Sequence, residues 1–364
     1  MKRTALSALA MALASTTFAG FTPGNLLVSV FGDGTTTLSS AGTQVAVAEF
    51  TKSGMATGVS AMTDTSRFTN SGTATSEGSL QGWGANSYVL LGGYDAPVGT
   101  AAIATSTGPR EVAKLNLATA TFSYQDLDTA YTGNNLRSVF SFDGTNFFTA
   151  GTAAAPNGGV RQGAFGTTTT TQVGASTPTN FRVVYGNPYD NPGGTVVYAA
   201  SATGAYQGIS RIDTVGGTTT LLNGFPTASG PSSYDFFFAN ANTLYVADDR
   251  ATTSGGGLQK WVYSAAAGSW SLSYTLTSGL ASTTTGIRQL AYDGTTIFAT
   301  TGETSGNHIV SIVDTGANSS FNVLATSGAN QLFRGIEVNP VPEPATLTAL
   351  GIGALALLRR KSRK

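Results

Sequence analysis

The sequence predicts an all-β fold, a single β-propeller of six four-stranded blades, from three observations. Hairpins with a polar turn recur along the chain at nearly regular intervals. Two further strand-like segments follow each hairpin, which makes units of four strands. The last unit holds one strand and the first unit lacks its leading strand, so the two complete one blade and leave no open sheet edge. Seven blades or a β-sandwich are the alternative folds.

Residues 1–19 precede this body and are typical of a secretory signal peptide. Met1, Lys2 and Arg3 form a basic start, residues 4–18 are uncharged and largely apolar, and Ala19 is a small exit residue. The alternative is the first helix of a cytoplasmic domain, but Gly20, Pro23 and Gly24 would break that helix at once. We therefore expect a signal helix followed by an exported body.

The body, residues 20–340, contains hairpins that resemble one another. Leu136–Thr152 reads LRSVFSFDGTNFFTAGT and Ile287–Gly302 reads IRQLAYDGTTIFATTG. Asp-Gly between two alternating strands is the strongest short-range hairpin signal. Further copies are predicted at Leu80–Tyr94, Phe181–Ala200 and Tyr234–Asp248.

The remaining strands of each unit follow its hairpin. Third strands are predicted at Glu111–Leu117, Gly159–Phe165, Gly208–Asp213, Leu258–Ser264 and His308–Asp314. Fourth strands are predicted at Phe122–Leu127, Trp270–Thr277 and Phe321–Ala325. Units begin near residues 80, 136, 181, 234, 287 and 333, and this spacing of 45 to 56 residues is the period of propeller blades.

The two incomplete units are expected to close the ring. Leu26–Met62 would supply three strands of the first blade and Phe333–Asn339 its fourth. A seventh, degenerate blade within Ser60–Ser79 is the alternative. The segment Leu244–Asp248, LYVAD, resembles the inner hairpins of NHL-like propellers.

Residues 341–364 have the organisation of a sorting tail. Val341, Pro342, Glu343 and Pro344 precede an uncharged run, Ala345–Leu358, and the chain then becomes basic at Arg359, Arg360 and Lys361. The run has 14 residues, fewer than the roughly 20 that span a bilayer as a helix. We expect a short apolar helix, a marginal membrane segment whose basic end stays on the cytoplasmic side.

This tail resembles the PEP-CTERM sorting signal of Gram-negative bacteria in all three parts and in their order. The resemblance implies passage through the secretion machinery and recognition by an exosortase, a membrane protease thought to process such tails, usually in organisms that make extracellular polysaccharide. The protein would then reside in the cell envelope, or outside the cell once its tail is processed. An ordinary tail anchor is the alternative, and it differs in whether the tail is removed.

Composition excludes several classes of function. Residues 20–340 hold 12 basic and 18 acidic side chains, and an acidic body with three lysines does not suit nucleic acid. The sequence has no cysteine and one histidine, His308, so it can form neither disulfides nor thiolate or His-based zinc sites. No cofactor is predicted, and calcium is the one metal left open, through oxygen ligands at Asp126 with Asp128 and Asp248 with Asp249.

One position near the start of each inner hairpin is polar or charged in all units. Counting back from each inner turn identifies Gln81, Arg137, Arg182, Asp235, Arg288 and Arg334. We expect these side chains to form a net-positive ring near the entry of the central channel. Arginine forks suit carboxylates and sugars, so the ring is a candidate ligand site. The favoured interpretation is structural, with Asp235 pairing with Arg182 and Arg288 on adjoining blades.

These observations predict a non-enzymatic surface or matrix protein that binds a glycan, the polysaccharide coat or a surface protein. No catalytic residue is predicted. The alternative is a secreted polysaccharide hydrolase or lyase with Asp/Glu chemistry, which requires at least two carboxyl groups flanking one bond. Paired carboxyl groups in the channel mouth would favour that enzyme.

Overall fold

The structure is a computed structural model, and it describes residues 20–341 except residue 85 and residues 191–194. The predicted signal peptide, the apolar run and the sorting residues Pro342, Glu343, Pro344, Arg359, Arg360 and Lys361 lie outside the described residues. Among the residues that are described, no helix is long and apolar enough to cross a membrane.

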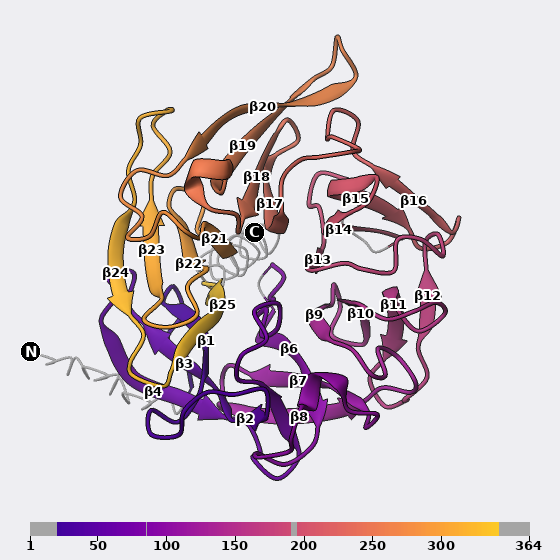
Figure 1. Ribbon diagram of the computed structural model, residues 1–364, viewed down its shortest axis with the longest axis vertical. Coiled ribbons are helices and arrows are strands. Elements are labelled where there is room, and N and C mark those ends of the chain that lie inside the picture. The colour runs from indigo at the N-terminus through magenta and orange to yellow at the C-terminus, as the bar shows by residue number, and fades with distance from the viewer. Residues whose placement is uncertain (1–19, 85, 191–194, 342–364) are drawn as a thin grey trace, which may run out of the picture.

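Six antiparallel sheets surround a central axis, which confirms the six-bladed propeller (Figure 1). Five sheets have four strands and the second has five. Blade 1 consists of β25 (Leu332–Val338), β1 (Leu26–Phe31), β3 (Val45–Phe50) and β4 (Ala56–Met62). Blade 2 consists of β2 (Gly42–Thr43), β5 (Phe68–Ser71), β6 (Tyr88–Asp95), β7 (Arg110–Asn116) and β8 (Thr121–Asp126).

The other four blades follow the chain from the inner strand outward. Blade 3 has β9 (Leu136–Phe140), β10 (Asn146–Gly151), β11 (Gly159–Ala164) and β12 (Thr171–Val173). Blade 4 has β13 (Val184–Tyr185), β14 (Val196–Thr203), β15 (Tyr206–Asp213) and β16 (Thr218–Leu221). Blade 5 has β17 (Ser233–Asn240), β18 (Thr243–Asp248), β19 (Gly257–Ser264) and β20 (Ser269–Leu276). Blade 6 has β21 (Ile287–Tyr292), β22 (Ile297–Thr301), β23 (His308–Ile312) and β24 (Asn322–Thr326).

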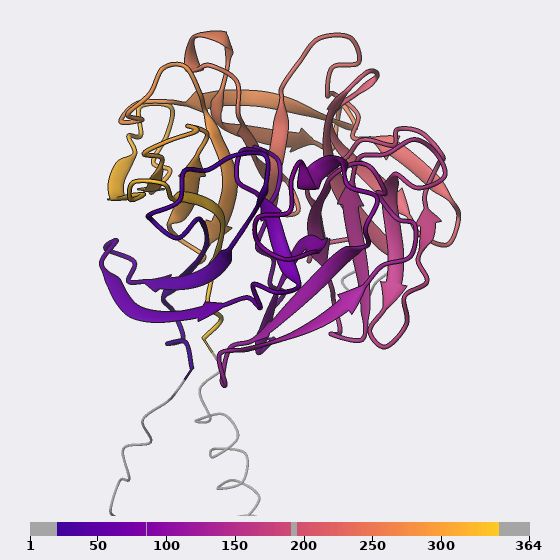
Figure 2. The same cartoon turned by 60° about the horizontal axis from the view of Figure 1, so that its bottom comes forward.

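Two short 3₁₀ helices, η1 (Ile103–Thr105) and η2 (Thr252–Ser254), lie in loops between strands. The ring closes as predicted, because β25 pairs antiparallel with β1 from Leu26 opposite Val338 to Phe31 opposite Leu332. Beyond these strands Asn339 donates a backbone hydrogen bond to Asn25 and accepts one from Gly24, each at 2.8 Å. The two described ends of the chain therefore lie side by side on one face of the ring (Figure 2).

Local chemistry forms the predicted hairpin turns. The Oδ1 atom of Asp143 accepts the backbone N–H groups of Thr145 and Asn146, each at 2.8 Å. Gly144 adopts a φ of 71°, a left-handed conformation that glycine reaches at little cost. Asp293 in blade 6 holds its turn in the same way, so the Asp-Gly pair fixes the register of both hairpins.

Blade 2 departs from the prediction at its inner edge. The expected leading strand from Leu80 is reduced to a single bridge between Gln81 and Leu90. The strand β5 pairs with the other end of β6, through Phe68 opposite Asp95. It therefore occupies part of the position that was expected for the leading strand from Leu80. Since β5 lies within Ser60–Ser79 and joins blade 2, this segment forms no seventh blade.

Hydrogen bonds between inner strands connect neighbouring blades. In three places a side-chain oxygen of one inner strand accepts a backbone N–H from the inner edge of the next blade, each at 2.9 Å. The pairs are Ser138 with Val184, Asp235 with Leu290, and Glu337 with Gly82. We call these three hydrogen bonds the interblade bonds. Apolar side chains fill the space between sheets, and Phe225 stacks on Trp261 with ring centroids 3.9 Å apart.

Candidate functional site

The four arginines of the predicted ring gather around Tyr234, at the start of the inner strands. The guanidinium carbons of Arg182 and Arg288 lie 5.1 and 5.8 Å from the centroid of the tyrosine ring. Tyr234 is 3% exposed, and its hydroxyl donates to the backbone oxygen of Thr75 at 2.8 Å. Burial raises the pKa of Tyr234, and Arg288, Arg182 and Arg334 oppose that rise. The buried ring of Tyr234 thus lies at the centre of the arginine cluster.

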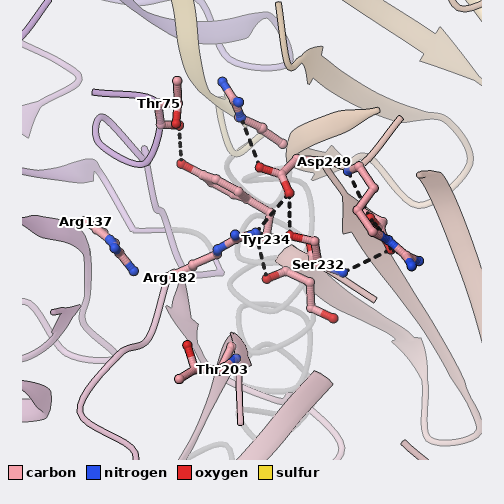
Figure 3. A network of polar contacts seen from close by, with 12 residues as sticks. Thr75, Arg137, Arg182, Thr203, Ser232, Tyr234 and Asp249 are labelled. Atoms are coloured by element: carbon pink, nitrogen blue, oxygen red, sulfur yellow. Dashed lines mark hydrogen bonds and ion pairs between the residues drawn. The ribbon is translucent and has the colours of Figure 1, made fainter. Parts of the chain in front are cut away.

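Asp249 is the acidic partner of this cluster, and the predicted pairing of Asp235 with two arginines was wrong. One carboxylate oxygen of Asp249 lies 3.1 Å from Nη1 of Arg182, and the other lies 3.5 Å from Nε of Arg288. Arg182 also donates to the backbone oxygen of Ser232 at 3.1 Å (Figure 3). Asp249 has a 15% exposed side chain, and although its partial burial opposes ionisation, this pairing holds its pKa below the ordinary value.

Several guanidinium nitrogens in the channel are buried without a hydrogen-bond acceptor in the described part of the chain. They are Nε and Nη2 of Arg334, Nη1 of Arg288 and Nε of Arg137. Arg334 is 4% exposed, and burial lowers its pKa to about 10 with a further contribution from neighbouring Arg288. Buried donors without an acceptor lower the stability of the folded protein. The site therefore has N–H donors left that an anion could bind.

A second buried acid, Glu77, lies near the arginines and was not among the predicted residues. It accepts hydrogen bonds from the Tyr94 hydroxyl and the Asn135 amide, each at 2.5 Å, and from the Ser71 backbone at 2.8 Å. Burial raises its pKa, and the charge of Arg334 opposes that rise. Even with Asp249 and Glu77 both ionised, the four arginines leave a net positive charge.

Access to the four arginines is unequal. The Arg182 side chain is 21% exposed, whereas Arg288 and Arg334 line a crevice beside Tyr234 that has no room for a water molecule. Arg137 is partly exposed and donates to Asn180 and to the backbone oxygen of Phe181, the latter at 3.1 Å. An entering group would therefore meet Arg137 and Arg182 first.

Gln81 and Asp235, the other two residues of the predicted ring, line a separate pocket further along the inner strands. This aromatic pocket measures about 350 Å³ and also contains Glu337. Its aromatic lining consists of Trp83, Tyr185, Phe236, Phe237, Phe238 and Tyr292. The structure therefore divides the predicted ring into an arginine site and an acidic, aromatic pocket.

The two carboxyl groups of the aromatic pocket bind backbone amides. Asp235 accepts the N–H of Phe236 at 2.8 Å and of Leu290 at 2.9 Å. Glu337 accepts the N–H of Gly82 at 2.9 Å and of Val338 at 3.0 Å. Burial raises the pKa of Asp235 to about 8 and that of Glu337 to about 7.

The acid pairs considered for calcium do not act as pairs. Asp128 accepts the backbone N–H and the hydroxyl of Thr170, at 3.0 and 2.8 Å, away from Asp126. Asp248 forms an ion pair with Arg250 at 2.7 Å, while Asp249 faces the channel. His308 lies at the start of β23, and its Nδ1 is 2.9 Å from the Thr326 hydroxyl.

The arginine site has a sequence signal that two acids lack. The arginines stand at a constant distance from the inner turns, with one extra residue in the case of Arg137. Glu77 precedes the inner edge of blade 2 and Asp249 follows the end of β18, so both lie outside that repeat. Their carboxylates reach the channel only because the blades fold into a ring.

Solved structures resemble this chain but share little sequence with it. TolB from Acinetobacter baumannii is 13% identical, with a TM-score of 0.53 over 89% of this chain and 67% of its own. A hypothetical selenium-binding protein from Sulfolobus tokodaii is 8% identical, with a TM-score of 0.44 over 86% of this chain and 93% of its own. A GH74 enzyme from Niastella koreensis is 16% identical, with a TM-score of 0.42 over 80% of this chain and 46% of its own. At 13% identity the similarity to TolB shows the fold alone.

A search of curated proteins finds no match. Residues 340–364 match the PEP-CTERM protein-sorting motif, which confirms the resemblance of the tail and indicates an exported protein that an exosortase sorts. The chain is thus a six-bladed β-propeller that carries a PEP-CTERM sorting motif at its C-terminal end.

Proposed function

We propose that the exported propeller is a non-enzymatic binding module whose arginine site takes acidic groups of an extracellular polysaccharide. One observation carries the proposal: four guanidinium groups converge on Tyr234, and several of their buried nitrogens have no acceptor among the described residues. Arginine recognises carboxylates through paired, charge-assisted hydrogen bonds. A uronate carboxylate supplies the two oxygen acceptors that the site lacks.

The geometry favours contact with a ligand at the outer arginines. The crevice that Arg288 and Arg334 line has no room for a water molecule, whereas Arg182 is partly exposed. A carboxylate of a sugar chain would meet Arg137 and Arg182 directly, and the buried Arg288 and Arg334 would add positive charge behind them. Export to the cell envelope or beyond places the module where acidic polysaccharide occurs.

Titration calorimetry with acidic and neutral oligosaccharides of equal length tests the proposal. The wild-type protein should bind a hexuronate oligosaccharide and not its neutral counterpart, and added salt should weaken binding. R137Q and R334Q should each weaken binding about tenfold or more, because R137Q removes a charge-assisted donor and R334Q removes buried positive charge behind it.

The matched control is R211Q, which removes an exposed arginine of blade 4 that pairs with Asp190 at 2.9 Å. It should bind like the wild type. Equal binding of acidic and neutral oligosaccharides, or unchanged affinity in folded R137Q and R334Q, would exclude the arginine site. Loss of binding in R211Q as well would point to non-specific charge attraction.

A second candidate function, polysaccharide cleavage, is favoured by a different observation. Asp235 and Glu337 share the aromatic pocket, and their raised pKa values suit a general acid near neutral pH. Each carboxyl group also holds a neighbouring inner edge through its interblade bond. Reducing-end assays on acidic and neutral polysaccharides test this alternative: turnover that D235N and E337Q abolish while both variants stay folded would establish an enzyme.

A further inference from the structure

Three carboxyl groups come together on blade 2, away from the channel arginines. Asp95 ends β6, Glu111 lies near the start of β7, and Asp126 ends β8. Glu111 stands directly opposite Asp126 on the neighbouring strand and opposite Gly93 on the other side. One oxygen from each of the three carboxyl groups lies within 4.8 Å of the others. The sheet register itself therefore assembles a cluster of three acids.

The cluster is incompletely neutralised by its arginine. Arg67 contacts Oε1 of Glu111 and lies 3.2 Å from Oδ1 of Asp126. The side chain of Glu111 is fully buried, and its other oxygen, Oε2, has no hydrogen-bond partner within the described residues. Three carboxyl groups face one guanidinium, so a buried oxygen and an excess of negative charge remain. A second cation would relieve the repulsion among the three carboxylates, because an opposite charge at short range favours the ionised form of a carboxyl group.

We propose that Asp95, Glu111 and Asp126 form a binding site for a divalent cation of the calcium type. All three donors are oxygens, which hard cations prefer, and calcium tolerates irregular geometry with oxygens at about 2.3–2.6 Å from the ion. Asp126 has a 36% exposed side chain, so water can complete the coordination from that side. Arg67 is 38% exposed, and the cation would compete with it for Glu111 and Asp126.

Calorimetric titration of the full chain with calcium chloride, after chelation of bound metal, measures the site directly. We expect a dissociation constant on the order of 10⁻⁴–10⁻³ M, the range of extracellular calcium modules. Saturating calcium should raise the melting temperature by about 5 °C, because it binds the folded chain alone. R67Q should bind calcium about tenfold more tightly, since it removes the competing positive charge at close range.

Variants of the acids separate a metal site from a cluster that serves Arg67. E111Q should abolish both the heat of binding and the thermal shift, and D126N, at a more exposed position, provides the same test if E111Q does not fold. D190N, which removes a carboxylate from the arginine pair of blade 4, should respond to calcium like the wild type. An R67Q variant without a calcium response, or a full response in folded E111Q and D126N, would overturn the proposal.

Discussion

Arg334 lies in the channel with two guanidinium nitrogens that meet no acceptor among the described residues. A buried, poorly paired charge of this kind costs stability, and apolar replacement of such groups often stabilises a protein. Burial lowers the pKa of Arg334, and the charge of nearby Arg288 lowers it further. The proposed anion site gives such a charge a purpose that folding does not.

This view predicts that R334M is more stable than the wild type and binds acidic oligosaccharides more weakly. We expect a gain of about 1–2 kcal/mol in the free energy of unfolding, measured by urea denaturation. The matched control is R110M, because Arg110 is equally buried but donates to the backbone oxygens of Ala104, Ser106, Gly108 and Asn134. R110M should lose about 3 kcal/mol or more as these acceptors lose their donors. A large loss in R334M as well would show that Arg334 serves the scaffold.

Asp314 illustrates the opposite case, an acid that its partners stabilise. It accepts hydrogen bonds from the hydroxyls of Tyr245 and Tyr274, and Nζ of Lys260 lies 2.9 Å away. Although burial opposes ionisation, these donors lower its pKa to about 2. The ionised form therefore contributes stability that is present above about pH 4 and is lost as the pH falls towards 2.

Replacing Asp314 by asparagine tests this assignment. At pH 7 D314N should lose about 2 kcal/mol of the free energy of unfolding, since it loses charge-assisted hydrogen bonds. The difference from the wild type should shrink between about pH 4 and pH 2, measured by urea denaturation at each pH. Y274F keeps the carboxylate and should show a smaller difference. A difference that is constant down to pH 2 would contradict the lowered pKa.

At the scale of residues, the sequence predicted where the arginines gather but not their acidic partner. Counting back from the turn assumes a regular strand, and β17 has a register shift between Ser233 and Phe236. Tyr234 thereby faces the arginines, while Asp235 lines the aromatic pocket. Asp249, which lies in a loop after β18, forms the ion pairs with Arg182 and Arg288 that were expected for Asp235. The alternation of residues in strands gives no information about this loop. Bulges of this kind leave no signal in hydrophobic alternation.

Among the structural elements, the closing strand β25 is constrained by its neighbours at Gly335. A Cβ atom on Gly335 would lie 2.3 Å from the backbone nitrogen of Leu80 and 2.5 Å from the carbonyl oxygen of Gly78. Both are backbone atoms of blade 2 and cannot move without shifting the inner edge. Glycine at this position allows blade 1 and blade 2 to approach each other.

We therefore expect G335A to destabilise the protein by about 3 kcal/mol, as overpacking in a rigid site does. G108A is the matched control, because a Cβ there would meet only the Asp95 carbonyl oxygen, at 3.8 Å. Its effect should stay within about 1 kcal/mol. Thermal unfolding of both variants measures the difference, and equal melting temperatures would mean that the contact of β25 with blade 2 is looser than described.

Strands were predictable where turn chemistry and alternation agree, as in β9, β10, β21 and β22. The predictions were poorest at the inner edge of blade 2, where two separate segments share the role of one strand. Pairing between β5 and β6 depends on the return of a long connection, and local sequence does not encode it. Interblade bonds, such as that of Glu337 with Gly82, are likewise visible only once the ring is formed.

On the scale of the whole molecule, ring closure separates the folded body from its tail. The strand β25 is part of blade 1, and Val341, just beyond it, is 63% exposed. Truncation after residue 341 should leave the melting temperature within about 2 °C of the full chain, since all described strands of the ring lie before that point. Truncation after residue 331 should abolish cooperative unfolding because it opens the ring. Equal stability of the two truncated chains, followed by calorimetry, would contradict closure by β25.

The central claim is that the closed propeller binds an anionic ligand at the arginine site. A crystal structure of the protein with a hexuronate oligosaccharide tests it most directly. We predict density for a carboxylate in contact with the guanidinium groups of Arg137 or Arg182, on the side of the site that faces Tyr234. Density confined to the aromatic pocket of Asp235 and Glu337, or no density under conditions that saturate binding in solution, would contradict the claim.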